Sequence, residues 1–309
     1  MKKFIIQIIK YFTVLVAIFV LLYFILLKIL CGVSAKYKDD LYSWNSHEVN
    51  VYESLIKLKN CKEQKIVIIG GSNTSFGFDS NKIYDLYQRP VFNTGTHAAI
   101  GLRLQVEFFK TFLNDGDIVI IAPEYEQFLG KLFWGNCTML EIVSMDSQLF
   151  NKLSLRQYIN GTKYIKEAIK ETLITRGIGI IDGPYGKKSL NKYGDISEYR
   201  THKQINPTHL ESDICHDAVR YLKDFMAECP ATVILLPPVF QDKSYDLNKG
   251  EIMLVDSILK INGVGFQASP YRYRFNDTLM FDTPYHCTSE GAVIRTQMVI
   301  EDMQSIIGD

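Results

Sequence analysis

The chain has 309 residues, of which 47% are hydrophobic, and it carries 34 basic and 34 acidic side chains. This length and apolar content suffice for a sizeable core in one large domain or two small ones. The balanced charge argues against a nucleic-acid-binding surface, and six cysteines without a Cys-x-x-Cys pair give no support to a zinc or redox motif.

The N-terminal segment is the most apolar part of the chain. Residues 11–27 are apolar except for Thr13, and apolar flanks extend this stretch to membrane-spanning length. We expect a transmembrane anchor over residues 1–38; a cleaved signal peptide that ends near residues 33–35 is the alternative. An N-terminal anchor places the rest of the chain outside the cytoplasmic membrane by default. That part would be acidic, because 28 basic residues remain in it against 34 acidic ones.

The next segments alternate between strand and helix signals. Residues 39–62 mix polar and aromatic side chains and are expected to form a juxtamembrane stalk and a first helix. After them, short uninterrupted apolar runs predict buried parallel strands, and apolar residues at helical spacing predict helices. The predicted strands cover residues 66–69, 90–93 and 117–122, and the predicted helices cover residues 82–87 and 101–114. Right-handed crossovers would then build a parallel sheet.

The second half of the chain begins with a long irregular segment. Residues 123–210 are too long for a simple connection, so we expect a helical insertion or lid, with a helix near 164–173. Regular signals then return, with a strand at 231–236 and helices at 213–228, 246–261 and 290–307. We therefore expect a single α/β domain over residues 63–309.

Two stretches carry residues that are suited to catalysis. The first strand ends in Gly70 and Gly71, which permit a sharp turn and deliver Ser72 to the carboxyl edge of the sheet, where open α/β sheets bind ligands. Near the C-terminus, Asp282 and His286 lie in a Phe-Asp-Thr-Pro-Tyr-His segment ahead of the last predicted helix. A serine needs a base to accept its proton and a third group to orient that base, and these residues supply both types.

Together the two stretches resemble the nucleophile block and the closing Asp-His block of the SGNH/GDSL hydrolases, in particular of their membrane-anchored cell-envelope branch. The resemblance implies a flavodoxin-like three-layer α/β/α fold with Ser72 as nucleophile, His286 as base and Asp282 as the orienting acid. One departure concerns spacing, because Asp282 lies four residues before His286 where the family usually has three. Asp277 or a backbone carbonyl is the alternative partner of the histidine.

Acyl transfer also needs hydrogen-bond donors for the oxyanion. The resemblance implies the backbone N–H groups of Ser72 and Gly95 as two of them. The family's third donor, an asparagine in a Gly-Asn-Asp block, is absent, because residues 122–126 read Ala-Pro-Glu-Tyr-Glu. Asn73 and Asn93 are alternative donors.

Polar residues at the strand ends are candidate substrate ligands. Asn73, Glu124 and His97 are expected near the same sheet edge, where they could contact a sugar hydroxyl. For Glu124 and its neighbour Glu126, a solvated loop carboxylate is an equally simple interpretation.

The resulting hypothesis is a membrane-anchored serine esterase or O-acyltransferase that acts on acyl esters, most plausibly O-acetyl esters, of cell-surface glycans. This chemistry requires no metal or organic cofactor. Its expected partners are the glycan substrate, the lipid bilayer around the N-terminal helix and a membrane acyltransferase. The alternative is a non-catalytic envelope protein that binds a glycan or such an acyltransferase. A third interpretation, transfer onto teichoic-acid-like polymers, uses the same residues.

Overall fold

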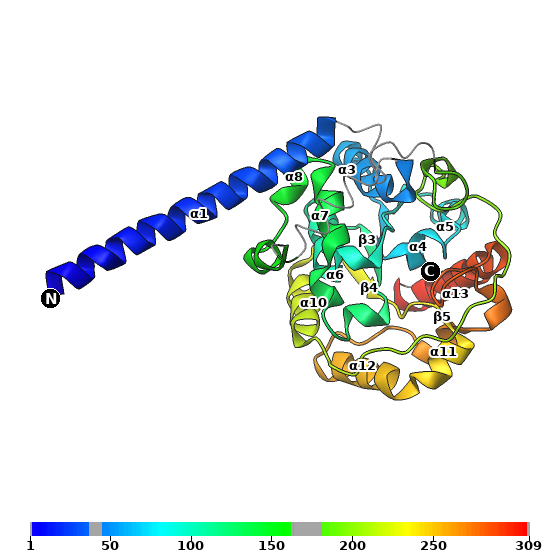
Figure 1. Ribbon diagram of the computed structural model, residues 1–309. Helices are drawn as coiled ribbons and strands as arrows, with labels where there is room; N and C mark the ends of the chain where they lie inside the picture. The colour runs from blue at the N-terminus through cyan, green and yellow to red at the C-terminus, as the bar shows by residue number, and fades with distance from the viewer. Residues whose placement is uncertain (1, 37–44, 162, 164–180, 308–309) are drawn as a thin grey trace.

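The computed structural model describes residues 2–36, 45–161, 163 and 181–307. Helix α1 (Lys2–Lys36) projects away from a body that contains most of the remaining described elements (Figure 1). Its first 22 residues, Lys2–Tyr23, are long and apolar enough to cross a membrane, and none of the most apolar 18-residue window within them is buried. An apolar helix without a polar face and without protein cover matches the expected anchor.

A four-stranded parallel sheet forms the centre of the body. Its spatial order is β2-β1-β3-β4, and its strands are β1 (Ile66–Gly70), β2 (Val91–Asn93), β3 (Ile118–Ala122) and β4 (Thr232–Leu235). The chain passes outward from β1 to β2 and then returns across β1 to β3, so the topological switch point lies between β1 and β3. Gly70 is in register with Ala122, which brings the residues after both strands to one place on the carboxyl edge.

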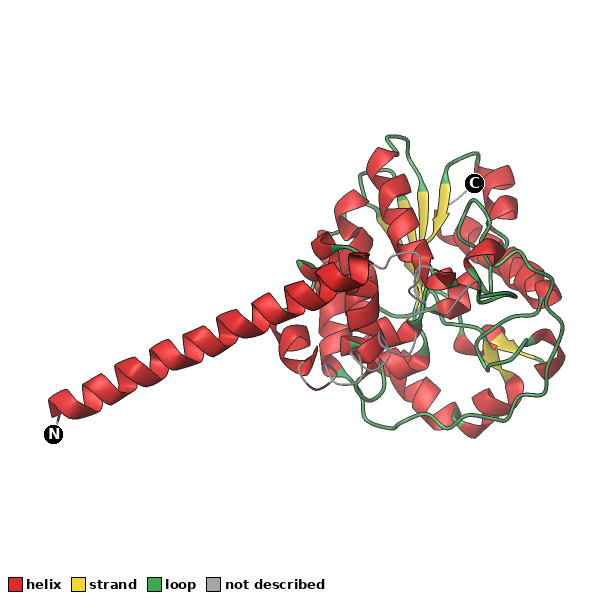
Figure 2. Cartoon of the chain, turned by 45° about the horizontal axis from the view of Figure 1, so that its top comes forward, coloured by secondary structure: helices red, strands yellow, loops and turns green. Residues whose placement is uncertain are grey.

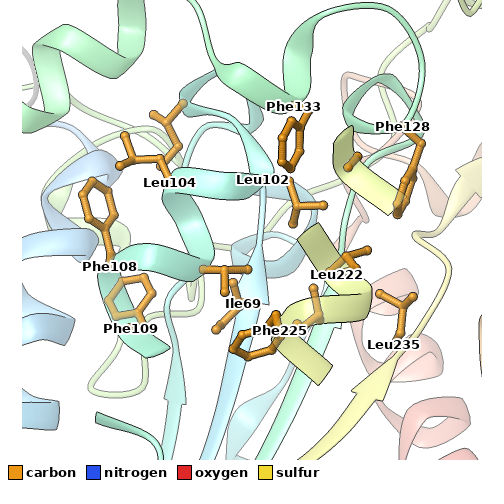
Figure 3. Packing of buried hydrophobic residues seen from close by; sticks show 14 of the residues in the cluster. Ile69, Leu102, Leu104, Phe108, Phe109, Phe128, Phe133, Leu222, Phe225 and Leu235 are labelled. Carbon is orange, nitrogen blue, oxygen red and sulfur yellow. The ribbon is translucent and has the colours of Figure 1, made fainter. Parts of the chain in front are cut away.

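Helices cover both faces of this sheet. Alternate residues of β1 and β3 enter two separate cores, because successive side chains in a strand point to opposite faces. Val67 and Ile69 pack with α6 (Leu102–Phe109) and α10 (His216–Glu228), as Figure 3 shows for Ile69. On the other face, Ile66 and Ile68 pack with α5 (Ser80–Tyr87) and α13 (Ser289–Ile307). The strands lie between these helices in Figure 2.

The described elements agree with most of the predicted strands and helices. All four predicted strands are present, although some bounds move by one residue. The predicted helix 101–114 is shorter, because α6 ends at Phe109 and the chain tightens into the 3₁₀ turn Lys110–Phe112. The predicted helix at 246–261 is divided into α11 (Asp242–Leu247) and α12 (Lys249–Ile261). The helix expected near 164–173 lies outside the described residues.

The first helix expected within residues 39–62 is present, but the second half of this range packs into the domain and does not form a stalk. Residues 45–60 contain a 3₁₀ turn, His47–Val49, and α3 (Asn50–Asn60). Val51 and Leu58 are buried in the same core as the sheet. The Asn50 side chain donates to the carbonyl oxygens of Asn93 and Gly95, at 2.8 and 3.0 Å. The domain therefore begins at least seventeen residues earlier than residue 63.

The described part of the insertion at 123–210 consists mainly of short helices and turns. It contains α7 (Cys137–Ser144), α8 (Ser147–Phe150) and the 3₁₀ turns Tyr125–Gln127, Leu132–Trp134 and Lys187–Ser189. A separate two-stranded parallel pair, β5 (Phe240–Gln241) and β6 (Arg274–Phe275), lies beyond β4. Residues 155–161 are also helical, and further 3₁₀ turns are Ala98–Ile100, Pro270–Tyr273 and Asp277–Leu279.

Candidate active site

Ser72 is the first residue of a short helix, α4 (Ser72–Ser75), which follows β1 after a single residue. Two glycines make this tight turn possible. A Cβ atom on Gly70 would lie 2.5 Å from Thr74 Cγ2, and one on Gly71 would lie 2.5 Å from Glu124 Oε1. Ser72 is partly exposed, whereas the other three residues of α4 are buried. The turn thus presents a single accessible hydroxyl at the sheet edge.

His286 lies beside this hydroxyl. The distance from Ser72 Oγ to His286 Nε2 is 2.8 Å, and the distance from His286 Nδ1 to Asp282 Oδ1 is 2.9 Å. Because a carboxylate can only accept, Nδ1 carries the ring proton and Nε2 is the acceptor for the hydroxyl of Ser72. The structure therefore brings the three predicted catalytic residues into one hydrogen-bonded chain.

A compact turn compensates for the four-residue spacing between the acid and the histidine. The His286 N–H lies 3.1 Å from Thr283 Oγ1, and the Phe281 N–H donates to the His286 carbonyl at 2.7 Å. These bonds curl residues 281–286 so that both side chains face the same way. Asp277, the alternative acid, instead accepts hydrogen bonds from Gln241 and Lys243.

The environment of the pair favours a neutral imidazole next to an ionised carboxylate. Burial lowers the pKa of His286 below its ordinary value, and the hydrogen bond with Asp282 offsets part of this effect. Burial by itself would raise the pKa of Asp282, but the hydrogen bond and charge of His286, together with a hydrogen bond from Tyr185, lower it. A neutral histidine can act as a general base at neutral pH.

Tyr185, from the insertion, is a member of the site that sequence reasoning missed. Its hydroxyl donates to Asp282 Oδ2 at 2.7 Å and lies 3.2 Å from His286 Nδ1. Phe76 closes the other side, because its ring stacks on the His286 ring at 4.1 Å between centroids and 7° between planes. Neither residue belongs to a motif, so only the folded chain reveals their contact with the histidine.

Two of the predicted oxyanion donors, Gly95 and Asn93, already donate hydrogen bonds to other groups of the protein. The Gly95 N–H donates to Asn93 Oδ1 at 3.1 Å, and the Asn93 amide donates to the Thr74 carbonyl and to Asp195 Oδ1. These bonds stabilise the loop after β2 against α4, so the predicted oxyanion role does not fit Gly95 or Asn93 in this arrangement. The Ser72 N–H has no acceptor among the described residues, as expected for the first turn of a helix.

Asn73 is also hydrogen-bonded to other residues of the protein. Its amide donates to the Ala122 carbonyl at 3.1 Å and to Glu124 Oε1 at 3.3 Å, and its own two oxygens accept from the buried Arg295 guanidinium. The residue therefore ties α4 to the end of β3 and to α13. This is a structural role, and it does not support the predicted substrate contact.

No protein-family model, curated protein or solved structure matches this chain.

His97 is the predicted substrate ligand that remains available. Its Nδ1 accepts the N–H of Ala99 at 3.1 Å, so a neutral ring carries its proton on Nε2. The side chain reaches solvent, but the surrounding protein removes part of its hydration, and this effect and the charge of His286 lower its pKa. His97 thus offers a neutral N–H donor near His286.

Glu124 and Glu126 lie close together after β3, and Glu124 is buried whereas Glu126 is partly exposed. Burial raises the pKa of Glu124 to about 8, and the neighbouring Glu126 adds to this effect. Glu124 Oε1 lies 3.4 Å from the Asn73 backbone nitrogen, at the start of α4. Burial also raises the pKa of Glu126, which accepts the Tyr285 hydroxyl. The solvated-loop interpretation is therefore wrong for Glu124, whose raised pKa favours the neutral acid at neutral pH close to the start of α4, whereas Glu126 is partly exposed.

Proposed function

We propose that this chain is a serine esterase or O-acyltransferase with an SGNH-like, flavodoxin-like fold. The observation that carries the proposal is the 2.8 Å contact between Ser72 Oγ and a neutral His286 that is held by Asp282. These side chains meet at the carboxyl edge of a parallel sheet, beside the switch point between β1 and β3. This is the location at which open α/β sheets bind their ligands.

The proposed reaction has two halves. His286 Nε2 accepts the proton of Ser72 while Oγ attacks the acyl carbon, and the Ser72 N–H stabilises the negative oxygen that forms. His286 then passes the proton to the departing alcohol, which leaves an acyl group on Ser72. Water or a sugar hydroxyl attacks this ester, again with His286 as base, and the bond between the acyl carbon and Ser72 Oγ breaks as His286 returns the proton to Oγ. Neither half requires a metal or an organic cofactor.

The proposed substrates are O-acyl, most plausibly O-acetyl, esters on a cell-surface glycan, with teichoic-acid-like polymers as another acceptor. The apolar α1 supports a membrane anchor. We propose in addition that the domain lies outside the cytoplasmic membrane, where such polymers occur. The Nε2–H of His97 is suited to a sugar hydroxyl or an acyl oxygen. A membrane acyltransferase that supplies the acyl group is a proposed partner.

A non-catalytic binding protein is the second candidate. The engaged donors of Gly95 and Asn93 favour it, because they leave the Ser72 N–H as the single backbone donor identified for an oxyanion among the described residues. Such a protein would bind a glycan or an acyltransferase without forming an acyl-serine.

A fluorophosphonate probe separates the two candidates, because it reacts only with an activated serine. We expect the full chain in detergent to be labelled on Ser72, as located by peptide mass spectrometry. The Ser72→Ala variant should not be labelled, whereas Ser197→Ala, which changes a serine outside the site, should be labelled like the native chain. Absence of labelling on Ser72 in a folded native chain would favour the binding protein.

Substitution of Tyr185 by phenylalanine should lower kcat for an aryl acetate by about ten- to a hundredfold. A hydrogen bond to a charged group contributes roughly 1.5–3 kcal/mol, and here the group is the carboxylate that orients His286. KM should stay the same, because the tyrosine holds Asp282 and not the substrate. Tyr199→Phe, at an exposed tyrosine, is the control. An unchanged kcat in Tyr185→Phe would show that Asp282 is held without this hydroxyl.

The rate should depend on pH in a bell shape. It should rise as His286 loses its proton, with a midpoint below the ordinary histidine value of about 6.5, because burial disfavours the charged ring. It should fall again near pH 8, because ionised Glu124 would place a negative charge beside the Ser72 N–H that must stabilise the oxyanion.

The Glu124→Gln variant tests the alkaline limb of this profile. A glutamine cannot ionise, so the fall near pH 8 should disappear in measurements of kcat/KM against pH. The exposed Glu228 provides a matched control, and Glu228→Gln should keep the native profile. An alkaline limb that persists in Glu124→Gln would assign the fall to a different group.

A further inference from the structure

The last turns of α1 do not lie free of the body. Helix α1 packs against α7 and α8, and the Tyr23 hydroxyl donates to the Tyr158 carbonyl at 2.9 Å. Figure 1 shows the C-terminal part of α1 next to α8, on the left side of the body, from which the N-terminal part of α1 projects. The body therefore contacts α1 directly at Tyr23.

Tyr23 lies near the C-terminal end of the apolar stretch that can cross a membrane. Residues 11–27, apolar except for Thr13 and bounded by Lys10 and Lys28, measure about 26 Å at about 1.5 Å per residue, close to the ~30 Å thickness of a hydrocarbon core. If this stretch spans the bilayer, Tyr23 lies about one helical turn from its C-terminal end, close to the interface that tyrosine favours. Tyr158 and the helical turn around it then lie at the same level.

That turn, residues 155–161, has the composition of a membrane-contacting segment. Leu155 and Ile159 lie four residues apart on one helical face, and they are 71% and 57% exposed. No acidic residue occurs between Asp146 and Glu167, whereas two lysines, Lys152 and Lys163, flank the turn. Exposed apolar side chains with flanking cations are typical of a helix that lies in the headgroup region.

We propose that the face around Leu155 and Ile159, with Lys152 and Lys163, is a second membrane contact that docks the catalytic domain on an anionic lipid surface. The apolar side chains would enter the boundary of the acyl chains, and the lysines would contact lipid phosphates. The contact is continuous with the span and would hold the domain in one orientation on the bilayer. This inference rests on the proposed anchor and not on catalysis.

Photocrosslinking of the full chain in nanodiscs that contain anionic lipid tests the contact. The photoreactive residue p-benzoylphenylalanine is introduced in place of Leu155, Ile159, Phe12 or Ile261, one at a time, and lipid adducts are measured by mass spectrometry. Phe12 lies within the span. Ile261 is 84% exposed and is the last residue of α12, a helix that lies away from α1 in Figure 1. We expect adduct yields at 155 and 159 within a few-fold of position 12, and at least tenfold above position 261.

Each contrary result has its own meaning. Yields at 155 and 159 as low as at 261, with strong labelling at 12, would overturn the docking surface and leave the anchor intact. Absence of labelling at 12 would remove the anchor and the surface together. Because crosslinking does not need an active serine, a failure of fluorophosphonate labelling would leave this inference untouched.

The lysines are tested in the same assay. Substitution of both, Lys152→Gln with Lys163→Gln, should lower the adduct yield at position 155 several-fold in anionic nanodiscs and leave it unchanged in zwitterionic ones. Lys249→Gln, on α12, is the matched control. Equal yields in the double variant and the native chain would overturn the assignment of the lysines to lipid headgroups.

Discussion

His286→Ala should lower kcat for hydrolysis of an aryl acetate by about four orders of magnitude or more, the scale expected for loss of the base in a serine triad. In the proposed mechanism Ser72 loses its proton to His286 Nε2, which lies 2.8 Å from Ser72 Oγ. KM should change little, because the imidazole is proposed to accept the proton of Ser72 and not to bind the substrate. The rate should be measured on the full chain in detergent, and the concentration of active Ser72 should be determined by fluorophosphonate labelling.

The control for this prediction is another histidine of the same chain. His209 is exposed and lies far from Ser72 in sequence, so His209→Ala should retain the native rate. The double variant Ser72→Ala with His286→Ala should be no slower than either single variant, because both remove the same step. Additive losses, or a rate in His286→Ala within tenfold of native, would contradict the proposed proton transfer.

Lys65→Met should destabilise the domain by about 3 to 5 kcal/mol, the usual cost of removing one partner from a buried ion pair. Lys65 precedes β1 and Asp117 precedes β3, and their side chains are each 1% exposed with 2.6 Å between Nζ and Oδ2. Loss of the lysine leaves a carboxylate in the core, with the backbone N–H groups of Lys65 and Asn114 as its remaining donors. The free energy of unfolding should be measured with urea in detergent by near-ultraviolet circular dichroism.

A double variant separates the unpaired charge from the lost packing. Lys65→Met with Asp117→Leu removes both charges, and it should recover most of the stability that the single variant loses. Lys260→Met changes a largely exposed lysine that is also paired with an aspartate, and it should cost less than about 1 kcal/mol. A loss of this small size in Lys65→Met would show that water reaches Asp117.

The strands of the sheet could be predicted because their signal is local. Residues 66–69 and 118–121 are unbroken runs of isoleucine and valine, and both faces of the resulting strands are buried. The role of residues 45–60 could not be predicted in this way. Their polar and aromatic mixture resembles a linker, and the hydrogen bonds of Asn50 with the loop after β2 exist only once the chain has folded.

In the candidate site too, residues with a local sequence signal could be predicted, whereas contacts that form only in the folded chain could not. Ser72, His286 and Asp282 were predicted from residue types that serve one chemistry, together with a turn that requires glycine. Tyr185 reaches the site from an irregular insertion, and no spacing rule connects a tyrosine there to an aspartate 97 positions later. Gly95 is predicted as a donor from a motif position, and Asn93 is an alternative because the asparagine of the motif is absent. Neither pattern shows that these two residues bond to each other.

The proposed nucleophile and its proposed base are separated by 214 positions along the polypeptide. A ribosome makes Ser72 long before His286, so a nascent chain that ends between them carries a hydroxyl without the histidine that is proposed to activate it. Reactivity toward esters would then begin only when the C-terminal segment closes onto the finished sheet. An incomplete or truncated product would be chemically silent, and covalent labelling of Ser72 would report the fraction of molecules that have completed folding.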